Sequence, residues 1–236
     1  MIASMLMKPE YHFLGTNEET FKNGIPDLKL SSELVIAFDT SNWRKLDMLL
    51  RDITPDKTEE DPDLMPAVLS IFKGVDSERQ AVIVHLLPSM VNLESFLSMK
   101  GYPFIVSLFR YTSIVVDEAA DIIRTIDFSS KCLRQQRLIS VIASSKNAKA
   151  LNLLADLCKY EDIGTHVAKH DIPLPVQDNK NLGINSDENN DVLQKAADVE
   201  SEKEIELAVL KVYESILSHQ SAKEFVKPIK QPLVIA

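Results

Sequence analysis

Between Pro103 and Gly164 the chain contains neither glycine nor proline. β-Sandwiches and barrels need frequent tight turns, which usually rely on Gly, Asn or Asp in special backbone conformations. Only 6 of the 236 residues are glycine, so a strand-rich fold is disfavoured. Breaks within this stretch must come from polar capping residues, a role suited to the pairs Thr112-Ser113, Ser129-Ser130 and Ser144-Ser145. The sequence therefore predicts an all-α protein.

Apolar residues recur at helical spacing along most of the chain. Helices are expected at 32–38, 43–53, 64–73, 77–87, 93–100, 104–111, 117–126, 130–143, 147–160 and 192–217, the last as one long helix or two. Ser41 and Asn147 are expected to cap the helices that follow them, and Pro88 to interrupt its helix. Segment 54–62 is acidic and contains two prolines, so it is predicted to be a solvated loop.

Two segments of the chain match each other. Residues 66–73 align with 103–110 at an offset of 37 residues, with Pro, Ser and Phe in the same places. Phe72 and Phe109 occupy equivalent positions and are expected in the core, as is Trp43, the only tryptophan. A weaker third copy is expected to begin near Ala148, where leucines recur. A period near forty made of short helices indicates stacked helical repeats.

With this pattern, the stretch from about 32 to 160 resembles the armadillo and HEAT helical-repeat superfamily. The resemblance implies an α-solenoid whose extended surface binds proteins or peptides. An irregular helical-repeat bundle, in which the two segments match by chance, is the alternative. The expected organisation is an irregular N-terminal arm (1–28), a helical-repeat domain (29–170), an acidic Asn/Asp-rich loop (171–190), a C-terminal capping helix or helices (191–226) and an extended tail (227–236).

Charge and cysteine usage narrow the possible partners and compartments. The formal net charge of -9 opposes generic binding to nucleic acid or to an anionic membrane. No apolar run approaches the ~18 residues that a membrane-spanning helix needs. Cys132 and Cys158 lie within apolar helical patterns and are interpreted as buried, reduced thiols. A cytoplasmic or nuclear location is therefore expected.

The sequence offers no familiar catalytic motif. It lacks a GxSxG nucleophile motif, a glycine-rich phosphate loop and an HExxH zinc motif. Asp162, His166 and His170 are four residues apart and form the best metal-binding alternative, although surface histidines are the simpler interpretation. His85 lies in an apolar run and is expected to be a hydrogen-bonded core or groove residue rather than a catalytic base. No catalytic residue, metal or cofactor is therefore expected.

One group of basic residues is a candidate binding site on this acidic chain. Lys131, Arg134 and Arg137 recur every three residues, and Lys146 and Lys149 follow them. They are predicted to form a basic ridge that docks an acidic peptide or RNA, because arginine pairs with carboxylate or phosphate at two points. A solvated helix face is the alternative.

The function expected from these features is a non-catalytic adaptor or scaffold that binds a protein or peptide partner on a helical-repeat surface. Two alternatives stay open. One is a nucleic-acid-associated helical domain that binds RNA through the basic ridge. The other is an enzyme with an unrecognised site, because active sites assemble from residues that are distant in sequence.

Overall fold

The computed structural model describes residues 28–98, 101–170, 174 and 191–226, with side chains from residue 201 onward in the last range. All regular structure in these residues is helical and no strand occurs, which confirms the all-α prediction. None of the described helices is long and apolar enough to cross a membrane. The elements are α2 (Leu30–Asp39), α3 (Trp43–Arg51), α4 (Pro55–Glu60), α5 (Leu64–Gly74), α6 (Ser77–Met90), α7 (Leu93–Ser98), α8 (Tyr102–Leu108), α9 (Ser113–Arg124), the 3-10 helix η2 (Lys131–Arg134), α10 (Gln136–Ala143), α11 (Ala148–Leu157), α12 (Glu161–Lys169), α13 (Asp191–Leu217) and α14 (Gln220–Lys223).

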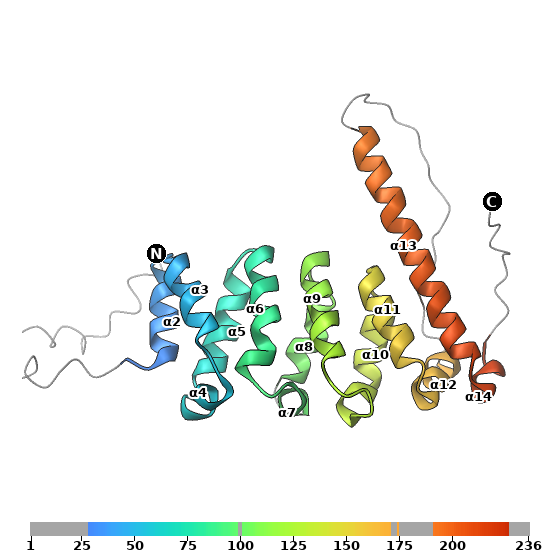
Figure 1. Ribbon diagram of the computed structural model, residues 1–236, viewed down its shortest axis with the longest axis horizontal. Coiled ribbons are helices and arrows are strands. Elements are labelled where there is room, and N and C mark those ends of the chain that lie inside the picture. Colours follow the sequence, from blue (N-terminus) through green and yellow to red (C-terminus); the bar gives the residue numbers. More distant parts are fainter. Residues whose placement is uncertain (1–27, 99–100, 171–173, 175–190, 227–236) are drawn as a thin grey trace, which may run out of the picture.

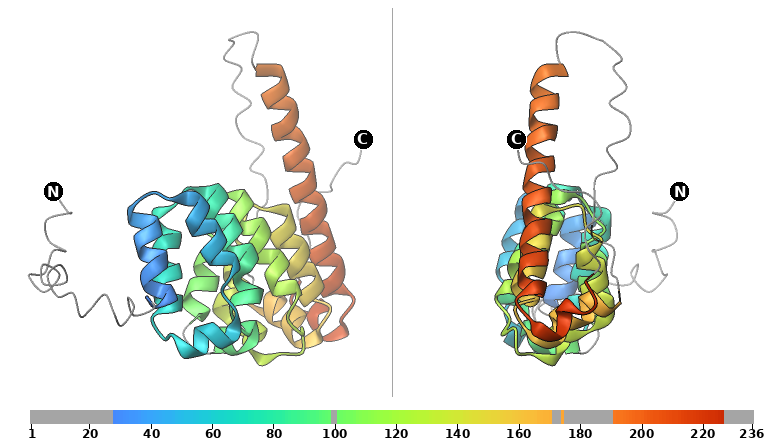
Figure 2. Two further views of the ribbon diagram at one scale, coloured as in Figure 1. Left: turned by 60° about the vertical axis from the view of Figure 1, so that its left-hand side comes forward. Right: turned by 90° about the vertical axis from the view of Figure 1, so that its right-hand side faces the viewer.

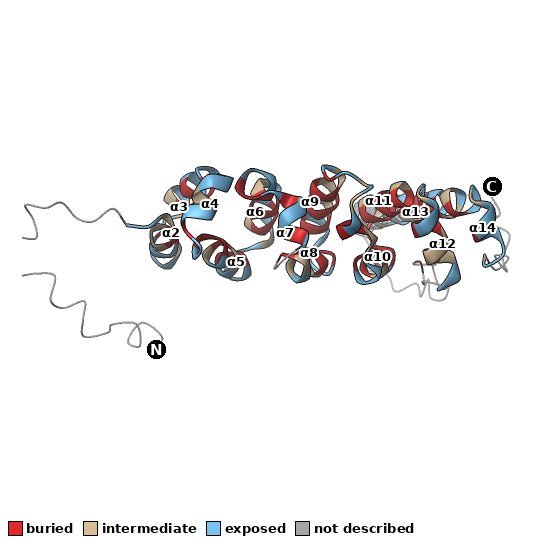
Figure 3. Cartoon of the chain, turned by 90° about the horizontal axis from the view of Figure 1, so that it is seen from below, coloured by how far each residue is buried: buried red, intermediate tan, exposed pale blue. Residues whose placement is uncertain are grey.

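The longer helices stand side by side in two layers along the long axis of the molecule (Figures 1 and 3). One layer holds α2, α5, α8, α10 and α12, and the other holds α3, α6, α9, α11 and α13. Each helix of the first layer packs against its successor in the second, and neighbours within the second layer also touch. The short helices α4 and α7 lie along one edge of the row (Figure 1).

The core lies between the two layers, where buried leucine, isoleucine and valine side chains meet (Figure 3). Phe72 of α5 is fully buried. Its ring meets those of Phe104 and Tyr111 edge-on, with centroid distances of 5.0 and 5.2 Å. Full burial of one such side chain stabilises the fold by about 1.5–3 kcal/mol, so the row is held together by many contacts of this size.

The two matching segments lie in the same layer. Residues 66–73 belong to α5, and 103–110 begin in α8 and end just after it. Phe72 and Phe109 are both buried, which confirms their predicted core role. The expected third copy at Ala148 is wrong in position, because α11 packs against α9 and α10 and so lies in the other layer. Helices of both layers carry similar leucine spacing, so sequence alone does not assign the layer.

The segment predicted as a loop at 54–62 contains helix α4 instead. Pro55 sits in the first turn, where its missing N–H has no helical partner to lose. The Thr54 side chain caps the helix by accepting from Lys57 N at 3.4 Å. Thr58 Oγ1 donates to Met90 O at 2.8 Å, tying α4 to the end of α6. The loop prediction was wrong because Pro55 starts a helix here, although proline often ends one.

Three further boundaries differ from expectation. Pro88 lies inside α6, which continues to Met90, so the helix tolerates the backbone hydrogen bond that this proline cannot make. Asn42 rather than Ser41 caps α3, and Ser41 adopts a positive φ of 54°. The expected helix at 130–143 is divided into η2 and α10 by the extended backbone of Gln135, with φ -74° and ψ 125°.

The C-terminal helices close one end of the row. α13 is a single helix of 27 residues, about 40 Å long at 1.5 Å per residue. Helix α11, on which it packs, has only 10 residues, so the N-terminal part of α13 rises above the body (Figures 1 and 2). α14 follows and packs against α12. The arm and the tail predicted at 1–28 and 227–236 lie outside the described residues apart from Leu28, and so does the loop at 171–190 apart from the buried Leu174.

Candidate interaction surface

The outer face of the second layer is crossed by polar contacts that join α6 to α9, α9 to α11 and α11 to α13. His85 of α6 lies 3.0 Å from Glu118 of α9, measured from Nδ1 to Oε2. From α9, Arg124 reaches Asp156 of α11 with an Nη2–Oδ2 distance of 3.5 Å. A close ion pair between Asp121 and Lys149 also joins α9 to α11, and Lys211 of α13 donates to Asn152 of α11 at 3.1 Å. The face is therefore charged and ordered by its own contacts.

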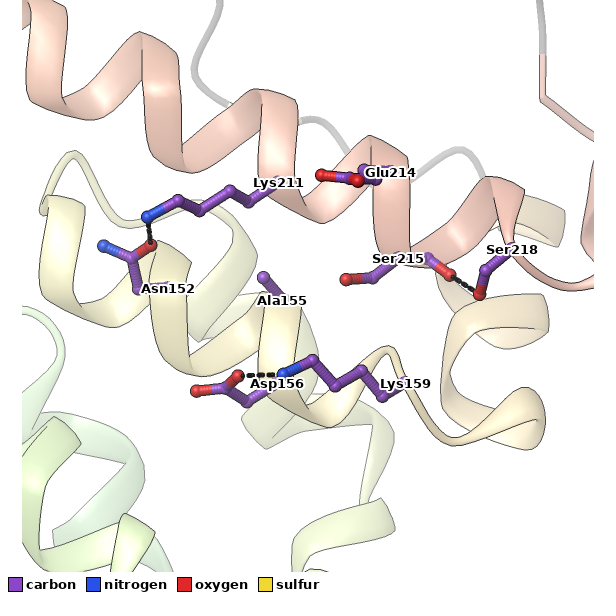
Figure 4. Close-up of a pocket in the computed structure, with 8 residues that line it drawn as sticks. All are labelled: Asn152, Ala155, Asp156, Lys159, Lys211, Glu214, Ser215 and Ser218. Atoms are coloured by element: carbon purple, nitrogen blue, oxygen red, sulfur yellow. Dashed lines mark hydrogen bonds and ion pairs between the residues drawn. The ribbon is translucent and has the colours of Figure 1, made fainter.

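Two hollows lie along the line where α11 and α13 meet on this face. The first has a volume of about 580 Å³ between the C-terminal halves of the two helices (Figure 4). It is lined by Asn152, Ala155, Asp156, Lys159, Lys211, Glu214, Ser215 and Ser218. The second, of about 410 Å³, is lined by Ser113, Asp117, Lys146, Asn147, Ala148, Lys149, Asn152, Ser201, Glu204, Leu207 and Lys211. The two hollows share Asn152 and Lys211, and together they are called the α11–α13 groove.

Charges of both signs line this groove. Lys159 is neutralised by Asp156 through an Nζ–Oδ1 contact of 2.8 Å, visible in Figure 4. Lys146, Glu204 and Glu214 have no hydrogen-bond or ion-pair partner among the described side chains. Unpaired charges beside serine and asparagine side chains give the groove the means to bind a polar, charged ligand without first breaking internal contacts.

No protein-family model, curated protein or solved structure matches this chain. The surface is therefore interpreted from its own residues.

Sequence reasoning missed the residues that organise the groove. Asn147 was predicted only as a helix cap, and it does accept from Ala150 N at 2.9 Å. Its amide also donates to Ser113 Oγ at 3.0 Å and to Asp117 Oδ1 at 2.8 Å, both on α9. Asn152 could not be identified from the sequence as a surface-site residue, because a single asparagine within an apolar helix is common. Only the neighbouring helices show that these amides face a shared hollow.

The five basic residues predicted as a ridge do not form one row. Lys131 and Arg134 lie in η2, before α10 begins, whereas Lys146 and Lys149 lie beyond its other end. An eight-residue helix is about 12 Å long, so the two groups are separated by that distance or more. The ridge was predicted from a continuous helix, and the break at Gln135 removes that basis.

Two of the five basic side chains are already neutralised. Arg134 forms a close ion pair with Asp162 and lies over the Tyr160 ring, 5.7 Å from its centroid. Lys149 is paired with Asp121. Arg137 and Lys131 are exposed, and Lys146 lines the α11–α13 groove. The binding role of all five stays a prediction, and Lys146 is the one that lies in a hollow without a partner.

The three residues of the metal-binding alternative are not brought together. Asp162 is turned towards Arg134, while the rings of His166 and His170 lie 4.4 Å apart. The described part of the chain contains no group of three residues arranged to hold a metal ion. Nε2 of His166 is buried without a hydrogen-bond partner in the described structure. Burial, reinforced by the neighbouring His170, lowers the pKa of His166, so its neutral form is favoured.

The remaining candidate residues have structural roles. Cys132 and Cys158 are buried free thiols, which confirms their interpretation, and burial raises the pKa of Cys158 to about 12. Such a thiol is inert at neutral pH. His85 was expected to be a hydrogen-bonded core or groove residue. It does contact Glu118, but its side chain is 71% exposed, so it does not lie in the core. Trp43 is half-buried beneath Arg79, whose guanidinium lies 4.5 Å from the ring centroid.

Proposed function

We propose that this protein is a non-catalytic scaffold or adaptor that binds a segment of a protein partner in the α11–α13 groove. The observation that carries the proposal is the pair of hollows that run together along α11 and α13. Concave sites with a few unpaired polar groups are where proteins usually bind their ligands. A cytoplasmic or nuclear location is part of the proposal and is supported by the buried free thiols.

An armadillo- or HEAT-like α-solenoid is the architecture we propose for this scaffold. Support comes from the order of the elements, because a short helix, a first-layer helix and a second-layer helix follow one another three times. The short helices begin at equal intervals, at Pro55, Leu93 and Lys131. In such arrays each unit contacts its neighbours and leaves an extended surface for ligands.

An extended peptide fits the dimensions and chemistry of the groove. From Ser201 of α13 to Ser218, which directly follows the helix, the lining residues span about 25 Å at 1.5 Å per helical residue. An extended chain of about seven or eight residues covers that length at 3.3 Å per residue. The Asn152 amide can hydrogen-bond to a peptide backbone, while Lys146 and Glu214 favour acidic and basic side chains at separate points.

The proposal is tested by purifying the tagged full-length chain from its native cells and quantifying the proteins that accompany it by mass spectrometry. The groove variant combines Lys146→Glu with Lys211→Glu, because both side chains line the second hollow. We expect a stoichiometric partner with the unmodified chain, and a loss of at least tenfold with the groove variant, since two charge-complementary contacts become repulsive.

The matched control reverses the charges of Lys131 and Arg137, which are exposed and lie outside the groove. This control should keep the partner. If the control loses the partner and the groove variant keeps it, the binding site lies at the basic residues around η2 and not in the groove. If no stoichiometric partner accompanies the unmodified chain, the scaffold function itself is refuted.

A further inference from the structure

The last long helix presents a second apolar stripe on the face turned away from the body. Ala208, Val209, Val212 and Ile216 are buried on the side of α13 that packs against α11. On the opposite side Leu207, Leu210 and Leu217 remain 55%, 36% and 42% exposed. The end unit of a helical stack normally has a polar outer face that keeps it soluble, so a row of exposed leucines at this position is a candidate contact surface.

This stripe follows the spacing of a coiled-coil seam. Exposed residues Lys203, Leu207, Leu210, Glu214 and Leu217 recur at alternating intervals of four and three, and together they are called the α13 seam. Alternation of four and three residues keeps side chains on one face over successive turns and is the repeat by which two helices pack along their length. α13 stands at the end of the row of helices (Figure 2), and no other described helix covers the exposed residues of the seam.

The charges of the α13 seam complement those of a second copy of the seam that runs in the opposite direction. Lys203 and Glu214 lie at equal distances from the midpoint between residues 208 and 209, and so do Leu207 and Leu210. Two copies placed antiparallel about this midpoint would bring each Lys203 opposite the partner's Glu214, and each Leu207 opposite the partner's Leu210. A parallel pair would instead place Lys203 against Lys203 and Glu214 against Glu214, which is repulsive.

We propose that two copies of this chain form a symmetric dimer through the α13 seam, with their α13 helices antiparallel. Such an interface is isologous, because the same patch serves both copies. Four leucines form its centre and two Lys–Glu pairs flank them. The dimer joins the two helical rows end to end. The seam adjoins the α11–α13 groove, because Leu207 and Glu214 also line it, whereas Lys146 and Lys211, which the groove variant changes, lie outside the seam.

Sedimentation velocity of the full-length chain over a concentration series tests the proposal. The unmodified chain should dimerise, and Leu210→Glu should leave it monomeric, because it buries charge at the centre of the interface. Lys203→Glu and Glu214→Lys should each weaken dimerisation by about tenfold, since each change makes two flanking pairs repulsive. The double variant K203E/E214K should return to the unmodified dissociation constant, because the pairs are restored with their signs exchanged.

Glu202→Lys is the matched control, because Glu202 is exposed on α13 and lies off the seam. It changes the net charge as Glu214→Lys does and should leave dimerisation unchanged. All substituted side chains are exposed, and circular dichroism checks that each variant keeps its helix content. A monomeric unmodified chain, a dimer that survives Leu210→Glu, or a double variant that stays as weak as the single variants overturns the proposal. The groove variant should remain dimeric, so dimerisation and partner binding can fail separately.

Discussion

Replacing Asn147 with alanine removes three hydrogen bonds from one side chain. Its Oδ1 accepts from Ala150 N at 2.9 Å and caps α11. Its Nδ2 donates to Ser113 Oγ at 3.0 Å and to Asp117 Oδ1 at 2.8 Å, and these two bonds tie the start of α11 to α9. Asn147 itself is 9% exposed, so water would replace these bonds poorly.

The magnitude follows from the separate contributions. Loss of an N-cap costs typically about 1 kcal/mol. A neutral hydrogen bond contributes about 1 kcal/mol, and one to a charged group about 1.5–3 kcal/mol. We therefore expect Asn147→Ala to lower the free energy of unfolding by about 3.5–5 kcal/mol, which for a chain of this size is a fall in Tm of roughly 7–20 °C.

Urea unfolding followed by circular dichroism measures the change, with two comparison variants. Asn147→Ser keeps a capping oxygen but cannot reach α9, so it should recover only about 1 kcal/mol. Asn42 caps α3 through one bond, from Lys45 N at 3.1 Å, and Asn42→Ala should therefore cost only about 1 kcal/mol. If Asn147→Ala is no more damaging than Asn42→Ala, the bonds to α9 contribute nothing and the reasoning is refuted.

Three further predictions concern the core, a close backbone contact and a buried histidine. Phe72→Ala should lower the free energy of unfolding by about 3–5 kcal/mol in the same urea assay, because the buried ring leaves a cavity; a loss below about 1 kcal/mol would contradict its core role. Gly164→Ala should lower Tm, because a Cβ there would lie 2.9 Å from both Cys158 O and a ring carbon of His219, so that α12 and α14 must separate; an unchanged Tm would show that the contact is readily relieved. NMR titration should give His166 a pKa below 6.5 that rises in His170→Ala, since the folded state disfavours its proton. As pH falls below 6.5 the unfolded chain takes up this proton first, so stability should decrease there, and less so in His166→Gln.

Much of the helical content followed from local sequence. Asn147 was recognisable as a cap, and Phe72 and Phe109 as core residues, because capping and helical periodicity involve residues within a few positions of each other. Errors arose where local rules permit two outcomes. Pro55 starts a helix and Pro88 is accommodated within one, although proline often ends a helix.

The candidate surface was much less predictable. Lys146 and Lys149 were singled out from charge spacing, but the groove that Lys146 lines also needs Ser113 of α9 and Lys211 of α13. These residues are far apart in the chain, and no repeating pattern links them. The same holds for Arg134, whose partner Asp162 lies in a different helix. Pairing of charges across helices depends on which helices become neighbours.

The sequence by itself determined that the chain is helical, acidic and rich in capping residues, because these properties depend on composition and on neighbours along the chain. The tertiary structure decided which helices share a layer, which charges neutralise each other, where the α11–α13 groove opens and which face of α13 remains uncovered. Those outcomes depend on packing between helices distant in sequence, where many pairings bury similar apolar area and only the full set of contacts selects one.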